Sequence, residues 1–223
     1  MKKLLALIAV LGFAAAPSRA DVALGTNFAP GSPLSMAANS VSGPMLLNVV
    51  SNSALKDVMS AWNVQLQIVA DVGTSGTLTF QTPATGTPTP PANYIFGSNG
   101  LGISTTNSGS QLTANDFLDP GVGPGVAVPT APGSNLLQMT YHSSANASGL
   151  FGIYAVEGAA NTQWSDATPA TQFFSNVPNG TAKIRIGEVL VIQAVPEPTP
   201  PQLIAVAVAV FAGLKALSRR LSG

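Results

Sequence analysis

Apolar and polar residues alternate along several stretches of the chain. In the clearest stretch two glutamines and one asparagine separate four apolar residues, namely Trp62, Val64, Leu66 and Ile68. Because successive side chains of a β-strand point to opposite faces, this pattern predicts a strand with one face on a core and the other in water. The same alternation predicts three further strands, over residues 77–81, 137–142 and 182–186.

The last of these stretches predicts an irregular strand. Ile184 and Ile186 fall on one face, but continuing that face would carry Glu188 into the core. We therefore predict a β-bulge at Gly187, because an extra residue at this point re-aims the side chains that follow.

Glycine and proline separate the strand signals. They are concentrated in residues 73–76, 83–91, 97–102, 120–132 and 178–180. Helical spacing appears in one place only, where Leu55, Val58 and Met59 suggest a short helical turn around residues 54–62. Short strands separated by turns favour an all-β fold, which we expect to be a single antiparallel β-sandwich of the jelly-roll or Ig-like kind.

The first twenty residues have the composition of a secretion signal. Two lysines precede an apolar stretch over residues 4–16, and Ser18 and Ala20 supply small residues at the two positions that a signal peptidase reads. We therefore predict a signal peptide over residues 1–20, with cleavage between Ala20 and Asp21.

The other end of the chain combines a Pro-Glu-Pro tripeptide, an uncharged apolar run and two arginines. These are Pro196, Glu197 and Pro198, then residues 203–214, then Arg219 and Arg220. Extended past Lys215 to Leu217, the run would form about 22 Å of helix, against a bilayer core of about 30 Å. The basic side chains can hold such a helix with its end on the cytoplasmic side. The pattern therefore predicts a short and temporary membrane anchor.

This tail resembles the PEP-CTERM sorting signal of exported bacterial proteins. Pro196, Glu197 and Pro198 stand at the namesake tripeptide of that family, and the two arginines stand at its terminal basic cluster. The resemblance covers the tail alone and implies recognition by an exosortase, a membrane-embedded cysteine transpeptidase. It divides the precursor into a mature domain over residues 21–195 and a sorting tail over residues 196–223. An ordinary C-terminal anchor that is never cleaved is the alternative.

The mature domain carries few charges. Residues 21–195 contain three basic and eight acidic side chains, a net charge of −5, and the chain has no cysteine. Nucleic acids and anionic lipids bind proteins largely through neutralisation of phosphates, so the sequence argues against both as partners. The absence of cysteine excludes disulfides, zinc-thiolate sites and thiol nucleophiles, so stability must come from burial and backbone pairing.

Residues with catalytic or metal-binding chemistry are few. The sequence contains no nucleophile elbow, phosphate-binding loop, dinucleotide fingerprint or His-Glu-x-x-His motif, and we predict no cofactor. His142, the single histidine, falls on the polar face of a predicted strand, and we interpret it as a solvated side chain. Asp116 and Asp119 precede a turn at Pro120 and Gly121, and they either offer oxygen ligands to calcium or form an ordinary hydrogen-bonded turn.

Trp164 lies in the polar segment over residues 161–166 and has two interpretations. An exposed indole beside amides and a carboxylate is a platform on which a sugar ring can stack. Alternatively, the indole folds back from a loop and caps the core.

Together these features predict a non-enzymatic exported protein of the cell surface or extracellular matrix. The resemblance of the tail implies a structural or adhesive component of exopolysaccharide or biofilm, since such tails tend to occur in organisms that make exopolysaccharide. The expected partners are signal peptidase, an exosortase-type transpeptidase, the membrane during sorting, and extracellular polysaccharide. A carbohydrate-binding module that uses Trp164 is the first alternative. An extracellular hydrolase is the second, and a glycosidase would need two carboxylates about 5 to 9.5 Å apart in a cleft.

Processing at both ends is directly testable. We expect the surface form to lack residues 1–20 and everything beyond the neighbourhood of Pro196, because both ends carry removable signals. Intact mass measurement on protein from the native host gives the answer. Recovery of a chain that still carries residues 203–223 would make a permanent anchor the better account.

Overall fold

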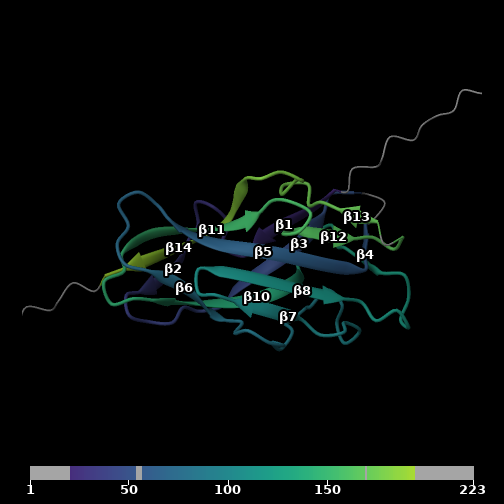
Figure 1. Ribbon diagram of the computed structural model, residues 1–223, viewed down its shortest axis with the longest axis horizontal. Coiled ribbons are helices and arrows are strands. Elements are labelled where there is room, and N and C mark those ends of the chain that lie inside the picture. Colours follow the sequence, from purple (N-terminus) through teal and green to yellow (C-terminus); the bar gives the residue numbers. More distant parts are fainter. Residues whose placement is uncertain (1–20, 54–56, 169, 194–223) are drawn as a thin grey trace, which may run out of the picture. The chain divides into compact units, whose positions relative to one another are not determined.

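Strands that bury every second side chain make up the described part of the protein. The computed structural model describes residues 21–53, 57–168 and 170–193. Within these ranges every regular element is a β-strand, and the strands form two main sheets and one small ribbon (Figure 1). The all-β prediction is therefore confirmed.

The smaller main sheet has four antiparallel strands. In spatial order they are β1 (Val22–Thr26), β3 (Met45–Ser51), β10 (Ser134–Ser143) and β6 (Leu78–Thr82). The ribbon consists of β4 (Val58–Met59) and β9 (Val126–Ala127).

The larger sheet has eight strands and is built around β5 (Ala61–Ala70). Two strands pair with the same edge of β5. The first half of that edge pairs with β12 (Gln163–Ser165), and β13 (Thr171–Gln172) follows outward. The second half pairs with β11 (Gly149–Val156), and β14 (Lys183–Ile192) and β2 (Leu34–Ala37) follow outward. On the other side of β5 lie β8 (Gln111–Phe117) and β7 (Ser104–Asn107). In Figure 1, β5 and β8 run side by side along the length of the sandwich.

One strand pair departs from the predicted antiparallel arrangement. β2 pairs with β14 in parallel, so that Leu34 lies opposite Val189 and Ala37 opposite Ile192. Alternation assigns each residue to a face of the sheet, but it specifies neither the neighbouring strand nor its direction. The sequence pattern therefore could not reveal this pair.

Side chains from both sheets meet in a single hydrophobic core. From β5, β6 and β10 the buried residues include Trp62, Val64, Leu66, Ile68, Leu78, Phe80, Leu137, Met139 and Tyr141. These are the faces that the alternation predicted. Because each sheet turns one hydrophobic face into the shared core, the architecture is a β-sandwich.

The predicted bulge in β14 is also present. The register against β11 shifts between Arg185 and Gly187, which leaves one extra residue in β14. Glu188, which follows the bulge, is 7 % exposed. Its carboxylate lies 3.1 Å from Nε of Arg185 and accepts a hydrogen bond of 2.9 Å from the N–H of Gly31. The buried acid therefore has partners, as burial of a charge requires.

The helical turn predicted around residues 54–62 is wrong where the structure describes this segment. Residues 54–56 lie outside the described ranges, but Val58 and Met59 form β4, and β5 begins at Ala61. Met59 is completely buried and pairs with Val126. Pairing with a strand distant in sequence thus overrides the local helical spacing.

The two faces of β5 should respond differently to mutation. Leu66 is fully buried, so Leu66→Ala should cost about 2 to 5 kcal/mol of unfolding free energy. The neighbouring Gln65 faces outward, and Gln65→Ala should stay within about 0.5 kcal/mol of neutral. Denaturant melts of residues 21–193 measure both. Similar losses from the two changes would contradict the assignment of the faces.

Candidate functional site

The residues predicted to direct export and sorting fall outside the described part of the chain. They are Ala20, Pro196, Glu197, Pro198, Arg219 and Arg220, together with the apolar run over residues 203–214. Asp21 is exposed, and β1 begins at the next residue. Among residues 21–53, 57–168 and 170–193, no helix has the length and apolar character needed to cross a membrane. Cleavage and sorting therefore stay predictions.

Trp164 belongs to the core. It lies in β12 opposite Trp62 of β5 and is 2 % exposed. A stacking platform needs an exposed ring, so this burial agrees with the alternative interpretation, in which the indole caps the core. The Nε1–H of Trp164 is buried and has no acceptor within the described residues, a state that is costly for a buried donor.

Asp116 ends a buried chain of hydrogen bonds that joins two strands and a loop. Nε1 of Trp62 donates to the Tyr94 hydroxyl at 3.1 Å, and that hydroxyl donates to Oδ2 of Asp116 at 2.5 Å. The N–H of Phe117 donates to Oδ1 at 2.7 Å. Burial raises the pKa of the Tyr94 hydroxyl, and the neighbouring Asp116 raises it further, so the tyrosine remains a donor. Asp116 therefore supports the fold, and its oxygens face protein donors.

The two carboxyl groups predicted as calcium ligands have separate hydrogen-bonding roles. Asp119 is exposed, and its Oδ1 accepts a hydrogen bond of 2.8 Å from the N–H of Gly121, which closes a turn. Within the described ranges, no cluster of three or more His, Cys, Asp and Glu side chains is arranged to hold a metal ion. The geometry of Asp119 agrees with the interpretation as a hydrogen-bonded turn.

Asp166 and His142 also have local surroundings. Desolvation acts to raise the pKa of Asp166, but hydrogen bonds from Thr168, Ala170 and Gln172 outweigh it and lower that pKa. His142 lies in β10 opposite Thr79 and is partly exposed. Asp166 therefore accepts hydrogen bonds within its own turn, and His142 occupies a regular position of its strand.

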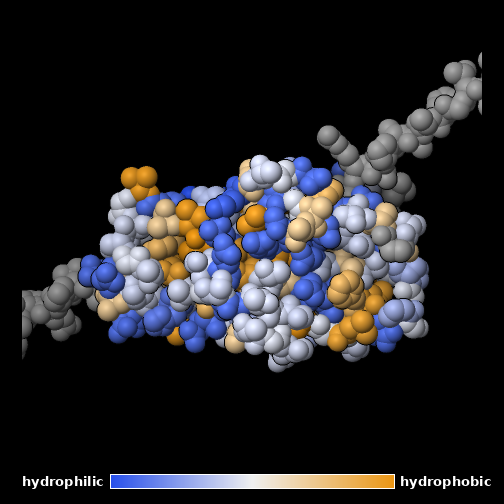
Figure 2. Space-filling model, in the orientation of Figure 1, coloured by the Kyte–Doolittle hydropathy of each residue, from blue (hydrophilic) through white to orange (hydrophobic). Residues whose placement is uncertain are grey.

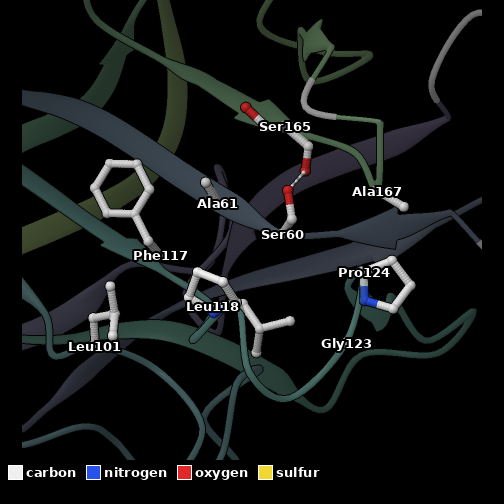
Figure 3. Close-up of a pocket in the computed structure, with 10 residues that line it drawn as sticks. Ser60, Ala61, Leu101, Phe117, Leu118, Gly123, Pro124, Ser165 and Ala167 are labelled. Carbon is white, nitrogen blue, oxygen red and sulfur yellow. Dashed lines mark hydrogen bonds between the residues drawn. The ribbon is translucent and has the colours of Figure 1, made fainter.

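An open pocket of about 730 Å³ lies at the end of the sandwich where β5 begins and β8 ends. Its lining is mostly apolar and includes Leu101, Phe117, Leu118, Pro120 and Pro124, with Ser60 and Ser165 as polar members. Figure 3 shows Phe117 and Leu101 on one side of the pocket and Pro124 and Ala167 on the other. Leu101 and Phe117 are 64 % and 54 % exposed, so this end presents apolar surface to solvent.

Backbone hydrogen bonds hold the walls of this pocket. The N–H of Leu101 donates to the carbonyl of Phe117, and the N–H of Leu118 donates to the carbonyl of Ser60, both at 2.8 Å. A Cβ atom on Gly100 would collide with the carboxyl group of Asp116, so glycine is needed for the loop to approach β8 this closely. The pocket therefore has a fixed frame.

The outer face of the larger sheet offers a second kind of surface. Across β8 and β5, uncharged polar residues lie directly opposite one another, as Asn115 with Asn63, Thr113 with Gln65, and Gln111 with Gln67. Opposed residues have Cβ atoms about 5 Å apart. These rows form a continuous band of amides and a hydroxyl without charge.

Phe117 and Leu101 carry no site prediction from the sequence. Phe117 occupies an outward position of β8, in line with Thr113 and Asn115. An apolar residue at a polar position of an alternating strand is the signal that could have identified it. Leu101 lies in a glycine-rich turn, where no periodicity marks it.

No family model and no curated protein matches the chain. Among solved structures, the sixth cohesin of Acetivibrio cellulolyticus scaffoldin B, in complex with a Cel5 dockerin mutant, is 12 % identical with a TM-score of 0.47, over 78 % of this chain and 100 % of its own. The cohesin of the Clostridium thermocellum complex Coh-OlpC-Doc435 is 12 % identical with a TM-score of 0.48, over 78 % and 97 %. Similarity at this level establishes neither family nor function, and the β-sandwich assignment rests on strand pairing and the core.

The two buried tryptophans should differ in what their N–H groups contribute. Trp62→Phe removes a hydrogen bond to Tyr94, whereas Trp164→Phe removes a buried donor without an acceptor. We expect Trp164→Phe to be less destabilising than Trp62→Phe by about 1 to 3 kcal/mol in denaturant melts. Equal losses would show that the Trp164 N–H is satisfied in solution.

Proposed function

We propose that this chain is a non-enzymatic protein of the cell surface or extracellular matrix, exported by its signal peptide and sorted through its PEP-CTERM-like tail by an exosortase-type transpeptidase. The mature sandwich serves as a structural or adhesive component of exopolysaccharide or biofilm. The two terminal signals support the route. They do not bear on what the sandwich binds, for which the evidence lies in its surface.

The open apolar pocket at the β5–β8 end is the observation that carries the adhesive role. Its walls are fixed by backbone hydrogen bonds, and Leu101 and Phe117 stand half-exposed or more at its edge. Exposed apolar surface of this kind is typical of contact sites between proteins. A rigid wall lowers the ordering cost of binding, so a small contact can suffice.

Carbohydrate binding is the second candidate, and the amide band on β5 and β8 favours it. Gln65 and Gln67 present amides at fixed spacing, whereas the Asn63 amide already donates to the carbonyl of Asn161 at 2.7 Å. Amides exchange hydrogen bonds with hydroxyl groups without an ionic contribution. Trp164 does not support this candidate, because its indole is buried. For the hydrolase alternative, the described residues that line the pocket include no carboxylate.

A retention experiment on matrix from the native host separates the two candidates. Wild-type residues 21–193 are compared with a Leu101→Ser/Phe117→Ser variant and a Gln65→Ala/Gln67→Ala variant, on untreated and protease-treated matrix. We expect retention to fall at least about tenfold in the first variant and after protease treatment, because aromatic anchors dominate such contacts.

The contrary outcomes are equally clear. Retention that survives protease and falls only in the glutamine variant would assign the contact to polysaccharide. In both cases binding should depend little on salt, since the surfaces involved carry no charge. A wild-type domain that is not retained on either matrix would contradict the adhesive role itself.

A further inference from the structure

We propose that folded domains of this chain assemble head to tail, with the turn after β5 of one copy seated in the apolar pocket of the next. The inference rests on the proposed structural role and deepens it, because it names a second copy of the same chain as the partner of the pocket. It follows from where the exposed apolar side chains lie.

The large apolar side chains that are exposed in the described chain fall into two groups. Leu101 and Phe117 line the pocket and are 64 and 54 % exposed, and Val122, which is 50 % exposed, lies between the lining residues Pro120 and Gly123. The second group consists of Val72, Val41 and Ile192, which are 107, 54 and 54 % exposed. The middle of the sandwich contributes none to this set of large, exposed apolar residues.

Strand pairing places the two groups at opposite ends. β5 starts at Ala61, which lies opposite Phe117 and lines the pocket, and it ends at Ala70, two residues before Val72. Ten strand residues span about 30 Å. Phe151 pairs with Ala70, and Gly149, two residues earlier in β11, pairs with Val191, so the end of β14 and Ile192 lie at the Val72 end.

Val41 belongs to the same end. It bridges His142 near the end of β10, and the next residue, Ser143, pairs with Leu78, where β6 begins after the turn that follows β5. Figure 2 shows a hydrophobic projection at the left end of the face in view and a hydrophobic group toward the right end. Further hydrophobic patches lie between them among hydrophilic residues, so the division rests on the exposed fractions of the large apolar side chains. In Figure 1 the turn that follows β5 lies at the left, and β12 and β4 lie toward the right.

The turn over residues 71–75, here called the Val72 turn, is a rigid projection. The N–H and the hydroxyl of Thr74 both donate to the carbonyl of Asp71, at 3.1 and 2.8 Å, and Gly73 supplies the positive φ of 87° that the turn requires. An ion pair of 2.8 Å between Asp71 and Arg185 ties the turn to β14. The fully exposed Val72 is therefore presented without further ordering, which favours binding.

The two ends are complementary in shape and charge. The pocket is concave and much larger than one valine side chain, so it can accept the tip of the Val72 turn with its backbone. No charged residue is among those that line it, and the one acid of the Val72 turn already pairs with Arg185. Joining the ends therefore removes apolar surface from water without burying an unpaired charge.

The symmetry of this contact decides the product. Two different surfaces meet, so the contact is heterologous, and surfaces at opposite ends of one strand lead to open chains and not to closed dimers. A linear assembly of sandwiches is the expected form, and it gives the proposed structural role a physical basis.

Complementation between two variants tests the inference. Val72→Asp disables the turn and leaves the pocket intact, whereas Phe117→Asp disables the pocket and leaves the turn intact. The strands and core that the structure describes lie within residues 21–193, so this fragment is used, with thermal melts to verify that each variant is folded. Gln111→Asp, an exposed change at the start of β8 and opposite Gln67 of β5, is the matched control.

Sedimentation velocity over a concentration series is the measurement. We expect the average mass of the wild type and of Gln111→Asp to rise with concentration, and each end variant alone to stay monomeric. An equimolar mixture of the two end variants has one working pair of surfaces, so it should form dimers and nothing larger.

Three results would overturn the inference. The first is a wild type that stays monomeric up to about 1 mM. The second is an assembly that Val72→Asp leaves unchanged, which would indicate pocket-to-pocket pairing. The third is a mixture of the two end variants that fails to form dimers. If the wild type is monomeric but is still retained on host matrix through Leu101 and Phe117, self-assembly falls while the adhesive role stands. If it is neither assembled nor retained, both fall.

Discussion

The buried carboxyl group of Asp116 is the constraint on which the pocket end of the sandwich depends. A carboxyl group can leave water only where donors reach it, and here they are the Tyr94 hydroxyl and the N–H of Phe117. Tyr94 belongs to the long connection between β6 and β7, so satisfying Asp116 draws that connection against β5 and β8. Gly100 permits the close approach, and Leu101 is thereby placed at the pocket. The hydrogen bonds that the buried Asp116 carboxyl group requires thus also place the apolar residue Leu101 at the pocket.

β5 carries this arrangement to the other end of the domain. It pairs with β8 along one edge and with β11 and β12 along the other, while its inward side chains are fixed in the core. A strand held in this way cannot slip by one residue without turning its apolar face to water. The pocket and the Val72 turn are therefore held at a constant separation, as a structural component of a larger assembly requires.

The small number of charged side chains limits the part that electrostatic attraction can play in binding a partner. Eleven charged side chains among residues 21–195 provide little long-range attraction, so recognition must come from contacts at short range. The pocket offers the removal of apolar surface from water, and the amide band on β5 and β8 offers exchange of hydrogen bonds. These surfaces lie next to each other on the same sheet, with Phe117 following the polar row on β8.

The sequence by itself determined the all-β class, the buried faces of β5, β6 and β10, and the bulge at Gly187, because each of these follows from alternation over a few neighbouring residues. The tertiary structure decided the parallel pairing of β2 with β14, the burial of Trp164 against Trp62, and the strand at Met59 in place of a helical turn. It also decided the pocket, which joins Ser60, Leu101 and Ser165 from distant parts of the chain. Alternation records which face of a strand avoids water, but it does not record which other segment covers that face, and the position of every one of these residues depends on that partner.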